Sequence, residues 1–142
     1  MRLWHKSLLP YLPQKQLCSQ WRECCCIARN IAIKGTPNHI LVNKIMDYPI
    51  THFIKYSQMV IDEMKRRGYK CSYDRLSCWI SLEVNGLPNE NELFHDWHNY
   101  RYAVQCYFNL QEKFDCSGIS KDEWFTFIDG FNYIEWDDEE DE

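Results

Sequence analysis

The sequence predicts an all-α protein, a single compact helical domain over residues 1–136 with a disordered acidic tail at residues 137–142. Two observations carry this prediction. Apolar residues recur at every third or fourth position along two long segments, residues 13–33 and 96–114, which is the spacing of one helical face. Helix-stopping residues separate such segments, and no internal repeat divides the chain. A chain of 142 residues is long enough for one buried core.

The first half of the chain predicts three helices. Pro13 suits the first turn of a helix over residues 13–33, and the Lys-Gly-Thr-Pro segment at residues 34–37 ends it. Residues 39–46 predict a short helix. A longer helix is expected over residues 51–67, with a threonine as its cap and a glycine as its stop.

The second half predicts three more helices. Residues 73–83 indicate a short one, and residues 96–114 show the clearest late helical pattern. The Ser-Lys-Asp-Glu segment at residues 120–123 is a capping box that opens the last helix, which Gly130 is expected to end.

The net charge of −5 is distributed unevenly along the chain. Residues 1–70 carry twelve Lys+Arg and four Asp+Glu, a net +8, whereas residues 71–142 carry four and seventeen, a net −13. A basic half of this size is typical of a face that binds nucleic acid. The alternative is that the two halves neutralise each other.

The chain shows no feature of a membrane or exported protein. No apolar run is long enough to span a bilayer, and Lys6, Pro10 and Pro13 interrupt any signal-peptide core. We therefore expect a cytoplasmic protein with no membrane partner. The eight cysteines are expected to be reduced thiols, with residues 24–26 serving mostly as small apolar fillers on a helix.

The amino terminus and the pair Arg22-Glu23 provide the groups needed for amine chemistry. The ordinary pKa of an α-amine is about 7.7–8.0, against about 10.4 for lysine, so a sizeable fraction is neutral and nucleophilic at physiological pH. A carboxylate such as Glu23 transfers protons, and a guanidinium such as Arg22 grips a phosphate.

Several stretches of the first half match a known pattern. They are Arg2-Leu3, Gln16-Leu17, Trp21-Arg22-Glu23, Asn38-His39 and the Met-Lys-Arg-Arg-Gly-Tyr segment at residues 64–69. In these stretches the chain resembles the pyrimidine-dimer DNA glycosylases of the phage endonuclease V type. The resemblance covers the first half well and the second half loosely. It implies an endonuclease V-like helical fold and a damaged or modified DNA duplex as the partner.

The resemblance also implies a reaction. In that family the terminal amine attacks the deoxyribose C1′ and expels the damaged base as a Schiff base forms, and a Glu on the first helix then assists β-elimination. The resemblance therefore implies a DNA-repair glycosylase with AP lyase activity, with Met1 and Glu23 as its catalytic residues and no metal or organic cofactor. The residues expected to contact DNA are Arg2, His5, Arg22, Arg29, His39 and Lys44.

The chain departs from the family pattern at several positions. Gln16 stands where the family has a basic His, and Cys26 stands where it has a second Arg. Because the bulky Arg2 follows Met1, removal of the initiator methionine is not expected. The alternative function is a non-catalytic helical module that binds nucleic acid, a nucleotide or a protein on the same scaffold.

A metal site is the other chemistry we considered. Metal-ligating residue types occur at His95, His98, Cys106 and Cys116. Their spacing matches no common zinc pattern, and no Cys-x-x-Cys motif occurs in the chain, so we expect no metal centre.

Overall fold

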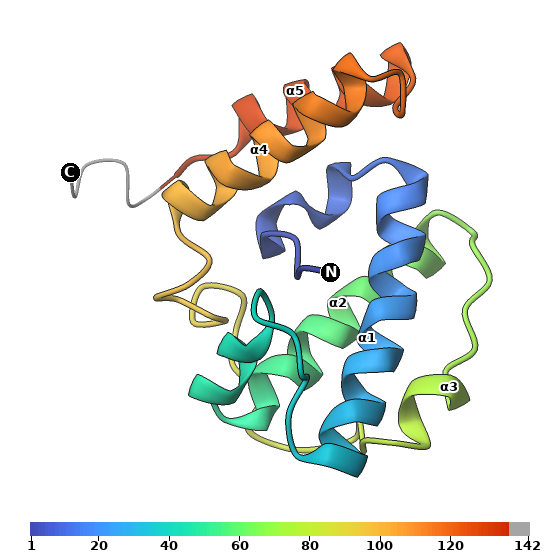
Figure 1. Cartoon of the computed structure of the whole chain (residues 1–142), viewed down its shortest axis with the longest axis vertical. Coiled ribbons are helices and arrows are strands. Elements are labelled where there is room, and N and C mark those ends of the chain that lie inside the picture. The colour runs from blue at the N-terminus through green and yellow to red at the C-terminus, as the bar shows by residue number, and fades with distance from the viewer. Residues whose placement is uncertain (137–142) are drawn as a thin grey trace.

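Two helix pairs and a short amino-terminal segment build the fold (Figure 1). The computed structural model describes residues 1–136, and within them every regular element is a helix, as the sequence predicts. In chain order the elements are the 3-10 helix η1 (Lys6–Tyr11), α1 (Gln14–Lys34), the 3-10 helix η2 (Asn43–Asp47), α2 (Ile50–Arg66), α3 (Asp74–Ser77), α4 (Tyr100–Asp115) and α5 (Lys121–Tyr133). The predicted acidic tail at residues 137–142 lies outside the described residues.

The amino-terminal segment lies between the two helix pairs. Helix α1 packs on α2, and α4 packs on α5 (Figure 1). The short η1 contacts both α2 and α5, so it bridges the pairs. One cluster of buried side chains draws on all seven elements. As a result, the amino terminus of the chain sits near the middle of the molecule rather than at its edge (Figure 1).

Helix ends follow the predicted chemistry at several places. Gly35 and Gly68, which follow α1 and α2, have φ angles of 76° and 78°, a left-handed conformation that glycine adopts without steric cost. Ser120 caps α5, because its hydroxyl accepts a hydrogen bond from the Glu123 N–H at 3.2 Å. Each of these residues marks one end of a long helix, and each does so through local backbone conformation or a local hydrogen bond.

Other boundaries differ from the prediction. Helix α2 begins at Ile50 directly after Pro49, so a threonine cap is not used. Of residues 73–83 only Asp74–Ser77 are helical, and of residues 39–46 only the last part enters η2. Helix α4 begins at Tyr100, later than expected, because the Asn99 side chain caps it by accepting the Tyr102 N–H at 2.9 Å.

Gly130 does not end α5, which continues to Tyr133. The glycine instead allows the amino-terminal segment to approach the helix. A β-carbon at Gly130 would lie 2.2 Å from Cγ of Tyr11, far inside van der Waals contact. The residue is needed for close packing of η1 on α5, a requirement that local sequence does not reveal.

The ion pairs of residues 1–136 are local. Glu63 pairs with Arg66 and Arg67 on one helix, and His95 pairs with its neighbour Asp96. No ion pair between described residues joins the basic half of the chain to the acidic half. The alternative that the two halves neutralise each other stays a prediction. No helix in this part of the chain is both long and apolar enough to cross a membrane.

Candidate active site at the amino terminus

The first five residues adopt no regular structure, so side chains must satisfy their backbone polar groups. Gln20 on α1 is fully buried and makes hydrogen bonds to two of these backbone groups. Its Oε1 accepts the Trp4 N–H at 2.8 Å, and its Nε2 donates to the Arg2 carbonyl at 3.0 Å. The hydroxyl of Tyr56 on α2 lies 2.6 Å from the Trp4 carbonyl and 2.9 Å from Gln20 Oε1. These contacts fix the amino-terminal backbone on α1 and α2.

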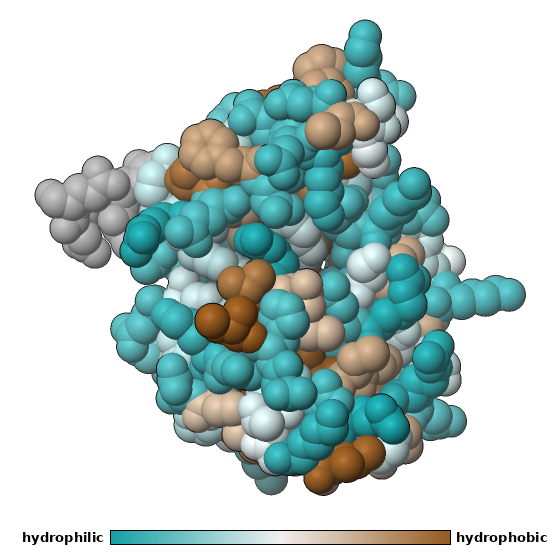
Figure 2. All heavy atoms as spheres, in the orientation of Figure 1, coloured by the Kyte–Doolittle hydropathy of each residue, from teal (hydrophilic) through white to brown (hydrophobic). Residues whose placement is uncertain are grey.

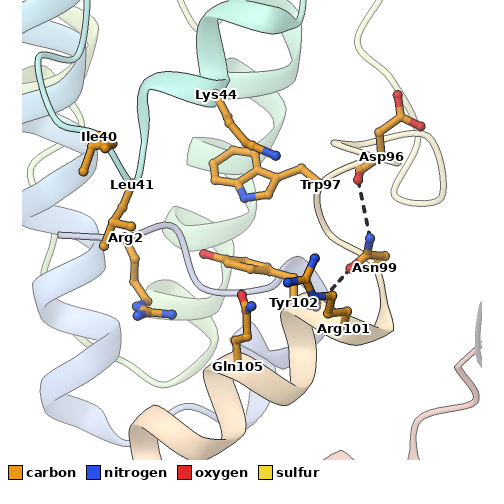
Figure 3. A pocket seen from close by; sticks show the side chains of 10 residues that line it. All are labelled: Arg2, Ile40, Leu41, Lys44, Asp96, Trp97, Asn99, Arg101, Tyr102 and Gln105. Carbon is orange, nitrogen blue, oxygen red and sulfur yellow. Dashed lines mark hydrogen bonds between the residues drawn. The ribbon is translucent and has the colours of Figure 1, made fainter.

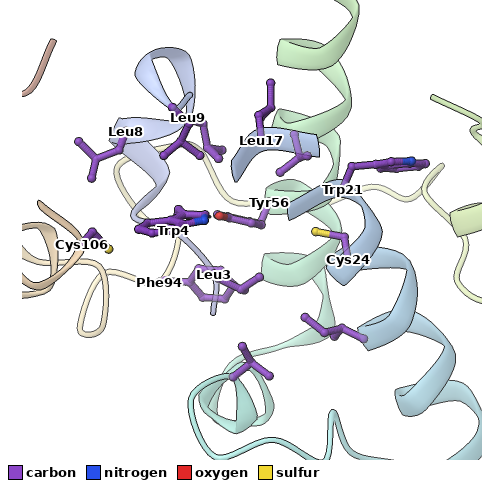
Figure 4. Packing of buried hydrophobic residues seen from close by; sticks show 14 of the residues in the cluster. Leu3, Trp4, Leu8, Leu9, Leu17, Trp21, Cys24, Tyr56, Phe94 and Cys106 are labelled. Carbon is purple, nitrogen blue, oxygen red and sulfur yellow. Dashed lines mark hydrogen bonds between the residues drawn. The ribbon is translucent and has the colours of Figure 1, made fainter. Parts of the chain in front are cut away.

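The second helix pair holds the same segment from the other side. The Tyr102 hydroxyl on α4 donates to the Leu3 carbonyl at 2.6 Å. His98, just before α4, accepts the Lys6 N–H on its Nδ1 at 3.0 Å. Leu3 is fully buried in the core (Figure 4). The segment therefore has one position, set by side chains from three helices and a loop.

Glu23 lies one turn after Gln20 and meets the start of the chain. Its carboxylate accepts a hydrogen bond from Gln20 Nε2 at 3.3 Å, and the backbone N–H of Arg2 is near enough to lower its pKa. Burial raises the pKa of Glu23; the charges of the Met1 ammonium, Lys113 and His39, together with the Arg2 N–H, lower it but do not cancel the rise. The α-ammonium is thus near enough to lower the pKa of the carboxyl group.

Two cations lie over the indole of Trp4, and one of them, Lys113, also lowers the pKa of Glu23. The Arg2 guanidinium carbon is 5.4 Å from the ring centroid, and Lys113 Nζ is 5.9 Å from it. Cations near an aromatic face are attracted by the ring quadrupole. The buried Trp4 ring therefore helps to hold positive charge from both ends of the chain near Glu23.

A pocket of about 560 Å³ opens next to Arg2 (Figure 3). Its lining residues come from the amino terminus, the turn before η2, and the start of α4: Arg2, Ile40, Leu41, Lys44, Asp96, Trp97, Asn99, Arg101, Tyr102 and Gln105. Arg2, Lys44 and Arg101 give the pocket three cations, whereas its one carboxylate, Asp96, faces His95 at 3.3 Å. The pocket is suited to an anionic ligand with an aromatic or sugar component.

The structure brings five of the predicted site residues together. The Met1 charge and the Arg2 backbone act on the pKa of Glu23, and Arg2 shares with Lys44 the pocket, which neither Met1 nor Glu23 lines. His39 is near enough to lower the pKa of Glu23 through its charge. Its Nδ1 accepts the N–H of Leu41 at 3.2 Å, so it also shapes the pocket rim.

The other three lie elsewhere. His5 is 2% exposed, its Nδ1 accepts the Ser7 N–H at 3.1 Å, and its ring stacks on His98. This burial leaves little of the His5 ring open to the expected contact with DNA, which stays a prediction. Arg29 extends over Trp79 on the α3 side and does not line the pocket. Arg22 is exposed beside Glu23 and donates to the Ser19 hydroxyl at 3.1 Å.

Three residues of the site were missed by sequence reasoning. Gln20 had a detectable pattern, because it is a polar residue between Leu17, Trp21 and Cys24 on the apolar face of α1. Lys113 and Arg101 had none, since they are separated from Glu23 by about half the chain or more.

The positions that depart from the family pattern also have clear environments. Cys26 is exposed, and Gln16 is buried with no partner for its Oε1. Of the metal-ligating types, His98 is buried in the core and His95 pairs with Asp96. Residues 1–136 contain no cluster of three or more such side chains arranged to hold a metal ion.

The start of the chain, the half-buried carboxylate of Glu23 and the basic pocket thus lie on one small helical scaffold. The sequence profile of the pyrimidine dimer DNA glycosylases matches residues 1–76, which is more than half of the chain. The protein therefore belongs to the pyrimidine dimer DNA glycosylase family, which implies DNA as its partner. No curated protein and no solved structure matches the chain. Helices α4 and α5, with one wall of the pocket, lie beyond the matched residues.

Proposed function

We propose that this chain is a DNA glycosylase with AP lyase activity, in which the Met1 α-amine is the nucleophile and Glu23 transfers protons. One observation carries the proposal. The positive charge of the Met1 amine and the backbone N–H of Arg2 both lower the pKa of Glu23, so the start of the chain lies close enough to this half-buried carboxylate to act on it. An α-amine has no flexible side chain, and its position depends on such anchoring of the backbone.

The proposed reaction proceeds in two stages. The neutral amine attacks C1′ of the target nucleotide, a bond from nitrogen to C1′ forms, and the base leaves with the electrons of the glycosidic bond and a proton. The sugar ring opens to give an imine. Removal of a proton from C2′ then expels the 3′ phosphate by β-elimination and breaks the strand. No oxidant or reductant takes part in either stage.

The electrostatic coupling between the two groups supports their roles. The Met1 ammonium lowers the pKa of Glu23, so the carboxyl becomes a stronger base when the amine loses its proton. Burial already raises the pKa of Glu23, which favours proton uptake nearer to neutral pH than an ordinary carboxylate allows. The carboxylate that receives a proton from the ammonium is therefore suited to receive one from C2′.

The cations around the site support binding of the DNA backbone. Arg2, Lys44 and Arg101 line the pocket, and Lys113 lies over Trp4. Phosphate contacts by such side chains release counterions from DNA, so binding should weaken steeply with added salt.

Borohydride trapping on a duplex with one abasic site tests the proposal. The wild-type protein should form a covalent adduct at its amino terminus, and acetylation of Met1 should abolish it. Glu23→Gln should slow strand scission on the order of 100-fold or more, the usual contribution of a general base. Glu112→Gln, at an exposed carboxylate on α4, is the matched control.

Two results would contradict the proposal. The first is the absence of any adduct with protein whose free Met1 amine is verified by mass spectrometry. The second is an adduct that persists after acetylation and a scission rate that Glu23→Gln leaves unchanged. Salt-sensitive DNA binding without an adduct would instead support the non-catalytic binding module.

A further inference from the structure

We propose that Ile40 and Leu41 form an apolar wedge that enters the DNA duplex and opens the base stack beside the nucleotide in the pocket. This inference rests on the proposed function, because it assigns DNA to the same pocket. Both residues lie in the turn between α1 and η2, within the rim of the pocket that contains Arg2 (Figure 3).

The two side chains are unusually exposed for large aliphatic residues. Ile40 is 84% exposed and Leu41 is 49% exposed. Figure 2 shows an apolar group surrounded by hydrophilic surface on the face that Figure 1 presents. An exposed apolar pair beside a pocket points to a contact made in a complex.

The turn that carries the pair is held rigidly. Asn38 has a φ of 61°, and the His39 side chain accepts the Leu41 N–H at 3.2 Å. The His39 N–H donates to Asn43 Oδ1 at 3.0 Å. The next residue, Val42, is fully buried and anchors the turn in the core. A wedge fixed in this way loses little conformational freedom when it inserts.

The charges around the pair identify DNA as the occupant. Arg2, Lys44 and Arg101 line the same pocket and make no ion pair with a described carboxylate. A duplex presents phosphates to such cations and apolar base faces to a wedge, so it complements both features. A second copy of the chain docked symmetrically on this face would bring the three cations against three identical ones.

The wedge has a clear function at this site. The amine can reach C1′ only when the nucleotide is drawn partly out of the helix, and unstacking opposes that movement. Apolar side chains inserted at a base step occupy the space that is left and kink the duplex. Ile40 and Leu41 stand opposite Trp97 and Tyr102 across the pocket, so a displaced nucleotide would lie between them.

The test compares one reaction on two substrates. The double variant Ile40→Ser/Leu41→Ser and the wild type are trapped with borohydride on an abasic-site strand, both as a duplex and as a single strand. We expect the variant to react on the order of tenfold or more slowly with the duplex, because unstacking is no longer offset. Its reaction with the single strand should fall by a smaller factor, because that substrate has no base stack to open and only the contacts of the two side chains within the pocket are lost. Ile33→Ser is the matched control, since Ile33 is 57% exposed on α1 and does not line the pocket.

A second measurement separates this inference from the proposed function. A 2-aminopurine beside the abasic site should brighten when the wild type binds the duplex and remain quenched with the double variant. This fluorescence measurement requires no covalent reaction. It therefore tests whether Ile40 and Leu41 open the base stack even if the wild type forms no adduct.

Three outcomes would overturn the wedge. One is an equal trapping rate for variant and wild type on the duplex, and another is an equal loss on both substrates. The third is a wild-type dimer, detected by sedimentation, that the double variant converts to a monomer, because the pair would then join two copies of the chain.

Discussion

The role of Gln20 can be tested by replacing it with leucine, which keeps its volume and removes its polar contacts. Gln20 Oε1 accepts the Trp4 N–H at 2.8 Å, and Nε2 donates to the Arg2 carbonyl at 3.0 Å. In the variant the buried Trp4 N–H loses its partner, which costs about 1–3 kcal/mol. The Tyr56 hydroxyl keeps the Trp4 carbonyl, and the half-buried Arg2 can recruit water. With the lost hydrogen bond to Arg2 at about 1 kcal/mol, we expect a total loss of about 2–4 kcal/mol.

Gln16→Leu is the matched control for this variant. Gln16 lies one turn earlier on α1, is also buried, and has an Oε1 without a partner. Its replacement should change the free energy of unfolding by about 0.5 kcal/mol or less, or stabilise the protein. Urea denaturation measures both values under identical conditions.

The same variant tests whether anchoring of the backbone positions the amine. Borohydride trapping should be performed where both variants remain folded, as judged by circular dichroism. We expect Gln20→Leu to trap abasic DNA more slowly than Gln16→Leu, because Arg2 and the amine are no longer held against Glu23. Equal stability of the two variants, or a destabilised Gln20→Leu that traps at the wild-type rate, would refute this reasoning.

Three further predictions concern pH and packing. Because the pKa of Glu23 is raised in the folded protein, the folded protein binds more protons at this residue than the unfolded chain does. The free energy of unfolding therefore falls as the pH rises from 4.5, the ordinary pKa of a glutamate, through the raised pKa of Glu23. Thermal unfolding of Glu23→Gln and of the wild type should therefore be measured between pH 4 and 8. We expect the stability of the variant relative to the wild type to increase as the pH rises. A stability difference that does not change with pH would contradict this. Lys113→Met should move the acidic limb of the strand-scission profile to higher pH, because the lysine charge lowers the pKa of Glu23, whereas Lys113→Arg should leave the limb in place. Gly130→Ala should destabilise by about 1–3 kcal/mol through overlap with Tyr11, although alanine is the better helix former by about 1 kcal/mol. If urea denaturation finds a gain instead, or if adding Tyr11→Ala fails to relieve the loss, the packing argument is wrong.

The fold was predictable where local chemistry decides it. The long helices follow from apolar spacing, and Gly35 and Ser120 mark ends that depend only on backbone conformation and a side-chain cap. Gly130 shows the limit of this approach. Its role depends on Tyr11, a residue more than a hundred positions earlier, and no local pattern reveals that the two segments pack together.

The site was predictable in its first half only. Glu23 and the amino terminus could be paired from the sequence, and Arg2 and Lys44 were expected near DNA. The placement of Lys113 over Trp4 and of Arg101 in the pocket depends on how α4 lies across the amino-terminal segment. The burial of His5 had the same cause, because its ring stacks on His98 and Tyr102 from that side.

The hydrogen bond between the Leu3 carbonyl and the Tyr102 hydroxyl has a consequence for biosynthesis. Residues near the start of the chain are the first to leave the ribosome, yet Tyr102 is made about a hundred residues later. A nascent chain that stops before α4 leaves its leading end without this anchor. The amino-terminal nitrogen would then be fully positioned only after the residues of α4 have left the ribosome and folded.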